Sequence, residues 1–327
     1  MLQRLVWGLL ALAAPLRAPD AATADNPPGA SVEEVLVVGE RSGPRLWKVS
    51  QGEHVLWILG TVDPLPAKLQ WQSDAVDAVL ANSQRVLLSG GVQIKASLFT
   101  RARLWLQWRK TRRNADDGTL QESLPPPMYE RFARARQRYA PHDGDLEKMR
   151  PLIAAEQLYR AALGKSNLAD RRKVERTVEQ LAARYHLKPE RVHIEIEATQ
   201  QFGNEVLGGL AALPLEQQLQ CMQVTLDDLD AGLVDLKRAA NAWASGDVAA
   251  LRAIPYRDQE ISCRDQLLGL PRIRQLREQV DAHWLEAAES ALRDSPSTLA
   301  VLAMPDLLKS DGLLARLAAR GYHVEGP

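Results

Sequence analysis

The sequence predicts an α/β or α+β domain whose single sheet is built from strands at both ends of the chain. Apolar runs typical of buried strands occur early, at 54–59, and late, at 298–302. Between about 96 and 250 the apolar residues mostly recur at helical spacing, which predicts a large helical middle. With 327 residues, the chain is long enough to bury a sizeable core.

The N-terminus has the order of features typical of a secretory signal peptide. A positively charged start at 1–4 precedes an apolar stretch at 5–16, and Ala22-Thr23-Ala24 matches a cleavage site. We expect cleavage after Ala24 and a periplasmic or secreted protein; the alternatives are an uncleaved anchor or a chance apolar start. The expected division is a signal peptide at 1–24, a leader at 25–43 and one domain at 44–327, with a helical insertion at about 96–190.

Two cysteines, Cys221 and Cys263, remain in the expected mature chain. Export makes a disulfide between them plausible, because disulfides persist in oxidising compartments. Two separate buried thiols are the alternative.

The first part of the domain predicts a hairpin followed by a strand–helix–strand unit. Residues 45–49 alternate like a strand, and 51–53 have turn chemistry before the apolar run at 54–59. A helix is expected within 71–81 and another strand at 86–88. The two strands of this unit are expected to be parallel, with a right-handed crossover.

Later in the chain, 192–197 alternates like a strand and 321–324 is expected to be a closing strand. Helices are expected at 172–186, 203–213, 215–231, 233–245, 284–292 and 312–319. The strand, turn and helix at 54–81 are echoed at 298–319, which suggests a degenerate duplication.

Both copies of this echo place an aspartate just after the apolar strand. The first is Asp63, in the stretch Gly-Thr-Val-Asp, and the second is Asp306, in the stretch Ala-Met-Pro-Asp. In sheets covered by helices, ligands bind beyond the carboxyl ends of the strands. The two aspartates are therefore candidate functional residues, with turn-forming carboxylates as the structural alternative.

Several short motifs resemble one known family by their order and spacing. They are LWKV at 46–49, VLWILGT at 55–61, Leu65-Pro66, Trp71, AWASGD at 242–247, LLKSDGLL at 307–314, Leu317 and RGYHV at 320–324. Together they resemble the TraB/GumN family, to which the Tiki proteins are related. The resemblance covers nearly all of the expected mature chain.

The resemblance also shows where this chain departs from the metal-dependent peptidases of that family. Those members carry two Gly-x-x-His motifs, a glutamate after the next strand, and an Arg–Asn pair before the last strand. The corresponding positions here are Asp63, then Ala303 with Asp306, then Ser89 or Gly90, and Val280-Asp281. Glu197, which ends a central strand, matches a family glutamate.

These departures favour a non-catalytic homologue that binds a peptide, a partner protein or an envelope component, with no cofactor. The alternative is a metal-dependent hydrolase of the peptidase kind. In that case Asp63, Glu197 and Asp306 would hold Mn, Mg or Ca, because carboxylates favour hard cations. One carboxylate or a bound water would then act in hydrolysis. A purely structural envelope protein is the third interpretation.

Charge and local composition bear on the partners. With 41 basic and 41 acidic residues, a global attraction to nucleic acid is not indicated. The basic, aromatic segment 101–113 favours a solvated amphipathic helix with Trp105 and Trp108 facing inward; a peripheral membrane contact is the alternative. His193, Glu195 and Glu197 project from one face of the expected strand at 192–197. This face could be an acid–base or metal cluster, or it could be the solvent-exposed side of an edge strand.

Overall fold

The computed structural model describes residues 43–114, 117–168, 172–254, 263 and 270–327 of the chain. The expected signal peptide at 1–24, and the leader as far as residue 42, lie outside the described residues. Within the described ranges, no helix is both long enough and apolar enough to cross a membrane.

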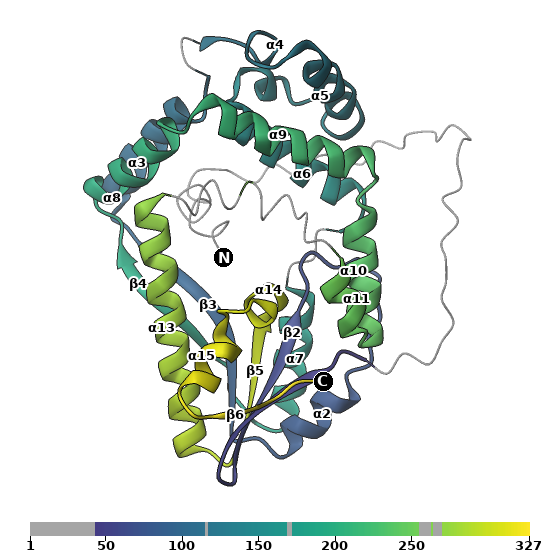
Figure 1. Cartoon of the computed structure of the whole chain (residues 1–327). Helices are drawn as coiled ribbons and strands as arrows, with labels where there is room; N and C mark the ends of the chain where they lie inside the picture. The colour runs from purple at the N-terminus through teal and green to yellow at the C-terminus, as the bar shows by residue number, and fades with distance from the viewer. Residues whose placement is uncertain (1–42, 115–116, 169–171, 255–262, 264–269) are drawn as a thin grey trace.

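Six strands of the described chain form one mixed sheet in the order β4-β3-β5-β2-β1-β6 (Figure 1). They are β1 Leu46–Gln51, β2 His54–Thr61, β3 Arg85–Lys95, β4 Glu190–Glu197, β5 Ser297–Ala303 and β6 His323–Glu325. Strands β4, β3, β5 and β2 run parallel, whereas β1 is antiparallel to both β2 and β6. The predicted sheet, with strands from both ends of the chain, is confirmed.

The expected hairpin is formed by β1 and β2. Gln51 pairs with His54, so Gly52 and Glu53 make the turn. Gly52 has a φ of 60°, a conformation that glycine adopts without steric cost. This tight turn fixes the register of β2 and therefore the point at which its carboxyl end leaves the sheet.

The strand order brings the two ends of the chain together. Strand β5 lies between β2 and β3, and it pairs with β2 from Ser297 opposite Val55 to Ala303 opposite Thr61. The strands of the predicted strand–helix–strand unit are parallel, as expected, but they are not neighbours, because β5 is inserted between them.

Helices fill the rest of the described chain. After β2 comes α2 Asp74–Ala81. Between β3 and β4 lie α3 Leu98–Thr111, α4 Leu120–Ser123, α5 Pro126–Tyr139, η2 Gly144–Lys148, α6 Pro151–Lys165 and α7 Lys173–Arg184. Between β4 and β5 lie α8 Gln200–Ala211, α9 Leu215–Asp230, α10 Val234–Ser245, α11 Val248–Ala253 and α13 Pro271–Asp294. The last two are α14 Met304–Leu308 and α15 Leu313–Ala319.

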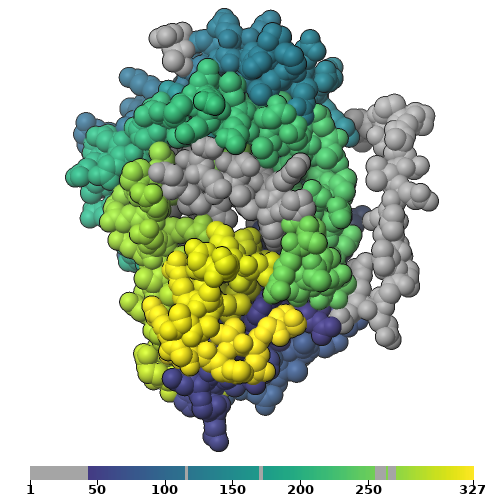
Figure 2. Space-filling model, viewed as in Figure 1, coloured from purple at the N-terminus to yellow at the C-terminus, as the bar shows by residue number. Residues whose placement is uncertain are grey.

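Three groups of buried apolar side chains hold these elements together. The largest packs the sheet against α2, α7, α10, α13 and α15. The second joins α5, α6 and α9, and the third joins α3, α8 and the start of α13 to the far ends of β3 and β4. Because α13 contributes Trp284 to the first group and Leu276 to the third, it couples the sheet to the α3–α8 region. Figure 2 shows the C-terminal segment, in yellow, between α13 and the α10–α11 pair.

Cys221, on α9, forms the expected disulfide with Cys263. Their Cα atoms are 4.9 Å apart, within the usual range for this bond. Closing the loop between them removes conformational entropy from the unfolded chain and stabilises the fold by about 4 kcal/mol. The disulfide suggests that the protein occupies an oxidising compartment.

Candidate functional site

The two aspartate-bearing segments lie next to each other at one edge of the sheet. Thr61 is paired with Ala303 in adjacent parallel strands, so the chain leaves β2 and β5 at the same level. A Cβ on Gly60 would lie 2.7 Å from Cε of Met304 and 2.9 Å from Cδ1 of Leu307. Glycine at this position therefore lets α14 pack directly against the end of β2.

A buried tryptophan supports the end of β2. Nε1 of Trp243, on α10, donates a hydrogen bond of 2.6 Å to the carbonyl oxygen of Gly60. The ring of Trp71 meets the Trp243 ring edge-on, with their centroids 5.4 Å apart. Because this bond is buried in the core, it helps to hold the backbone before Asp63 in place.

The residues that follow Trp243 also have local structural roles. Gly246 ends α10 with a φ of 73°, and a Cβ there would lie 2.6 Å from the carbonyl oxygen of Gly43. The Asp247 carboxylate accepts a hydrogen bond of 2.8 Å from the Ala250 N–H and so caps the first turn of α11. The AWASGD segment at 242–247 thus connects α10 to α11 and contacts the start of the domain at Gly43.

Asp63 and Asp306 occupy different local structures. Asp63 is an exposed loop residue after β2, and its peptide bond to Pro64 is cis. The turn expected at Asp306 is wrong, because the short helix α14 begins directly after β5, with Pro305 near its start. Proline at the first helical positions is favoured, since its missing N–H has no partner there in any case.

The Asp306 carboxylate is engaged by an arginine from α13. Nη2 of Arg277 lies 3.0 Å from Oδ1 of Asp306, and the two side chains are 20% and 19% exposed. One helical turn further along α13, Asp281 faces Arg316 of α15 at 3.7 Å. The result is a cluster of alternating charges that joins α13, α14 and α15 beyond the end of β5, and we call these four residues the α13 ion cluster.

Asp281 has the perturbed carboxyl group of this cluster. Burial raises the pKa of Asp281 above its ordinary value, because water no longer solvates the charged form. The positive charge of Arg277 lowers this pKa, whereas the negative charge of Asp306 raises it, and Arg316 and Lys309 lower it. The net upward direction shows that burial and Asp306 outweigh the neighbouring cations.

Glu197 lies far from the two aspartates. Lys95 pairs with Glu197 and lies seven residues beyond Leu88, which pairs with Val301, whereas β5 ends only two residues beyond Val301. One of these seven residues is taken up by the register shift between Ser89 and Gly91, so Glu197 lies four residues past the end of β5, or roughly 13 Å at about 3.3 Å per residue. Across the sheet, Glu197 on β4 is also separated from β5 by two strand spacings, or about 10 Å.

The proposed metal ligands therefore do not fit one common ion. Asp63, Glu197 and Asp306 all belong to the described residues, among which no group of three or more His, Cys, Asp or Glu side chains is placed to hold a metal. A hard divalent cation needs several oxygens within about 2.6 Å. The sheet edge offers it Asp306 already paired with a guanidinium and Asp63 in a separate loop.

The expectation that Ser89 and Gly90 follow a strand is wrong, because β3 continues to Lys95. The register between β3 and β4 shifts between Ser89 and Gly91. A Cβ on Gly90 would lie 2.7 Å from the carbonyl oxygen of Val192, so glycine permits the close approach of β4. A glutamate could not replace Gly90 without displacing that backbone.

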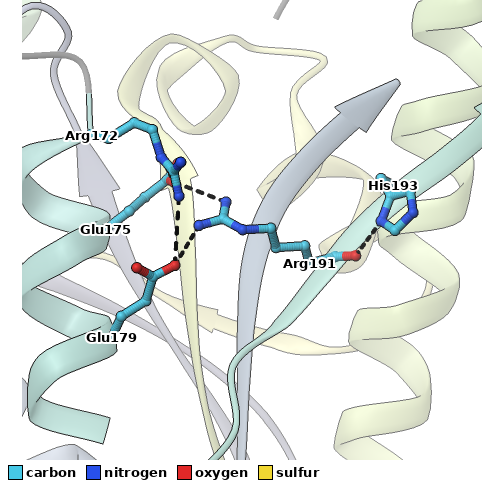
Figure 3. Close-up of polar contacts among 5 residues, drawn as sticks. All are labelled: Arg172, Glu175, Glu179, Arg191 and His193. Atoms are coloured by element: carbon cyan, nitrogen blue, oxygen red, sulfur yellow. Dashed lines mark hydrogen bonds and ion pairs between the residues drawn. The ribbon is translucent and has the colours of Figure 1, made fainter. Parts of the chain in front are cut away.

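The ionic residues near the start of β4 tie this edge strand to α7. Arg191 reaches toward Glu175 and Glu179 of α7, and Arg172 closes the network (Figure 3). Nη1 of Arg191 lies 2.9 Å from the Glu175 carboxylate, and its other terminal nitrogen contacts Glu179. Burial lowers the pKa of Arg191, but the two carboxylates outweigh it and the net direction is upward.

The polar face of β4 is occupied by local contacts. Nδ1 of His193 lies 2.8 Å from the carbonyl oxygen of Arg191 (Figure 3). Glu195 accepts a hydrogen bond of 2.6 Å from Lys95, which lowers the pKa of Glu195. Glu195 and Glu197 are exposed and Val192 is buried, as in the interpretation of this face as the solvent side of an edge strand.

Arg277 is the site residue that the sequence analysis missed. It lies four residues before Asp281, so both side chains project from the same face of α13. This spacing was the available signal. Its partner, Asp306, is 29 residues away in sequence, so no local sequence pattern indicates the contact.

Comparison with known proteins gives one finding about the chain as a whole. A family model described as the TraB/PrgY/gumN family matches residues 45–326, which include every described strand. No curated protein and no solved structure gives a significant match.

Proposed function

Because the chain belongs to the TraB/PrgY/gumN family, we propose that it is an exported, non-catalytic member that binds a peptide, a partner protein or an envelope component. The binding surface is the sheet edge beyond β2 and β5, which carries Asp63 and the α13 ion cluster. The observation that carries this proposal is the ion pair between Arg277 and Asp306, at the position that the family resemblance assigns to a metal ligand.

Charge supports a binding surface over a metal centre. The α13 ion cluster contains two arginines and two aspartates, so its formal charge is zero, and Lys309 adds a further positive charge nearby. A guanidinium at 3.0 Å from the Asp306 oxygen opposes a divalent cation at the same oxygen by direct repulsion. Alternating charges of this kind suit hydrogen bonds to a polypeptide, which carries both donors and acceptors.

The proposed location is the periplasm or the extracellular space. The signal-peptide features at 1–24 and the disulfide between Cys221 and Cys263 support export. Detection of the mature N-terminus at Asp25 in the culture medium or periplasmic fraction would test the location directly.

One observation favours the alternative, a metal-dependent hydrolase. Asp63 and Asp306 follow neighbouring parallel strands at the same edge of the sheet. For a metal site, Asp306 would have to leave Arg277, and a further ligand would have to replace the remote Glu197. The two functions make opposite predictions about metal content.

The test combines metal analysis, cleavage and binding on the purified chain. We expect no stoichiometric Mn, Co, Zn or Ca, no thermal shift on their addition, and no cleavage of a fluorescein-labelled pool of random-sequence peptides. We expect the same pool to bind, and Asp63→Arg to weaken binding several-fold through charge reversal. Glu53→Arg is the matched control, because Glu53 is exposed at the opposite end of β2.

Two outcomes would contradict the proposal. A stoichiometric metal that disappears in Asp63→Ala, together with cleavage abolished by a chelator, would establish the hydrolase. Peptide binding that is equally weakened by Asp63→Arg and Glu53→Arg would remove the sheet edge as the binding surface.

A further inference from the structure

Helix α3 is held to the rest of the molecule by one side only. Leu104 and Trp108 are buried, and a Cβ on Gly203 of α8 would overlap the Leu104 side chain, so the two helices are in close contact. The Gln107 side chain donates a hydrogen bond of 3.1 Å to Asn204 on the same side. Figure 1 shows α3 and α8 side by side at a corner of the molecule, beyond the end of β4 and apart from α14.

The opposite side of α3 exposes large apolar side chains. Leu98, Phe99 and Leu106 are 80%, 70% and 55% exposed, respectively. Phe99 and Leu106 are seven residues apart, which is two helical turns, so they lie one above the other on the outward face. The expectation that both tryptophans of this segment face inward is only half right, because Trp105 is partly exposed.

Basic side chains surround these apolar residues. The segment 98–113 contains six basic residues and no acidic one. Arg103 and Lys110 are also seven residues apart and lie beside Phe99 and Leu106 on the helix. The Arg103 guanidinium lies over the Phe99 ring, 5.3 Å from its centre. Neither Arg103 nor Lys110 forms an ion pair with a carboxylate of the described residues.

We propose that this outward face binds the surface of an anionic phospholipid bilayer. The α3 face consists of Leu98, Phe99, Arg103, Leu106, Arg109 and Lys110. Leu98, Phe99 and Leu106 would insert at the boundary between the lipid headgroups and the acyl chains. The basic side chains around them would form ionic contacts with lipid phosphates. We infer a lipid partner from the charge pattern. Within the described residues these cations form no ion pairs with carboxylates, and anionic lipid headgroups would supply the complementary negative charge.

The α3 face and the proposed binding surface beyond β2 and β5 are different parts of the molecule. The α3 face belongs to the helical corner, and the inner side of the helix packs through Leu104 on α8. The sheet edge with Asp63 and Asp306 lies at the ends of β2 and β5. Membrane binding through α3 would therefore leave that edge accessible, and substitutions on one surface would not disturb the other.

The test measures flotation of the purified chain with phosphatidylethanolamine–phosphatidylglycerol vesicles, with phosphatidylcholine vesicles as the uncharged comparison. All variants share the same N-terminus, so differences between them report on α3. We expect Phe99→Ser with Leu106→Ser to reduce partitioning at least about tenfold, because both side chains lose their apolar insertion. We expect Arg103→Gln and Lys110→Gln to reduce it about five-fold each.

The control variant is Leu215→Ser, which removes a side chain that is 48% exposed on α9 and should leave flotation unchanged. Thermal unfolding checks that each variant keeps its fold. Equal flotation with charged and uncharged vesicles, or equal loss in Leu215→Ser, would overturn the proposal. A chain that does not float, but whose self-association is abolished by Phe99→Ser, would assign the face to a second copy and overturn it as well.

Discussion

The segments that follow β2 and β5 start at the same level of the sheet, yet they are stabilised by different forces. The first is fixed through its backbone, because buried Trp243 donates a hydrogen bond to the Gly60 carbonyl. The second is fixed through its side chain, because Asp306 pairs with Arg277 on α13. Equivalent positions in neighbouring strands thus give an exposed aspartate in a loop and a largely shielded aspartate held by an arginine.

This difference explains how one residue type can have two roles in similar surroundings. Asp63 is exposed in its loop, so a partner molecule can reach its carboxylate. Asp306 would have to give up an ion pair that is largely shielded from water, and breaking such a pair leaves an uncompensated charge. The comparison is compatible with the proposed recognition role of the first segment and gives the second a structural role.

The largest expected effect comes from removing the support of the first segment. Trp243→Ala should lower the free energy of unfolding by about 3–5 kcal/mol, because it deletes a fully buried ring. Trp243→Phe should cost about 1–2 kcal/mol, mainly because the Gly60 carbonyl loses its donor. Equilibrium denaturation measures both values. Equal losses in the two variants would mean that the hydrogen bond, and not the ring volume, holds the end of β2.

A smaller effect separates the two aspartates directly. Asp306→Asn should destabilise the protein by about 1–2 kcal/mol, between the values for exposed and fully buried ion pairs. Asp63→Asn should change stability by less than about 0.5 kcal/mol, as is usual for surface positions. A double-mutant cycle with Arg277→Gln should give a coupling energy of about 1 kcal/mol with Asp306 and almost none with Asp63. The reverse pattern of coupling would contradict the assigned roles.

Much of the sheet was predictable from the sequence, because apolar runs and turn residues are local signals. The strands at 54–59 and 298–302 are found within a residue or two of the observed β2 and β5. The insertion of β5 between β2 and β3 was not predictable, because strand order depends on contacts between distant segments. The end of β3 was missed for a related reason, since the glycines at 90 and 91 indicate a turn locally but form a shift in register with β4.

The candidate site was predictable only in part. Strand-end position identified Asp63 and Asp306, and the parallel pairing of β2 and β5 places the segments that carry them at the same end of the sheet. The Arg277 contact required knowledge of where α13 packs, which no local pattern contains. Glu197 was grouped with the aspartates by resemblance, but the extension of β3 and β4 beyond β5 places it elsewhere.

The smallest expected effect concerns the pKa of Asp281, which is raised by the negative charge of Asp306 but not by that of Asp63. Its pKa is raised by burial and by Asp306, so the folded protein holds this proton more tightly than the unfolded chain. The favourable contribution is fully present below the ordinary pKa of about 3.9 and is lost as pH rises through the raised value. Relative to the parent, Asp281→Asn should therefore become more stable as pH rises from about 4 toward 7, and then level off.

Chemical denaturation across this pH range gives the difference in unfolding free energy between Asp281→Asn and its parent. In an Asp306→Asn background the pH dependence of this difference should shrink, because one cause of the raised pKa is gone. In an Asp63→Asn background it should persist, because Asp63 is not among the charges that perturb Asp281. If both backgrounds reduced it equally, the two segments would share one electrostatic site, and the division between recognition and stability would fail.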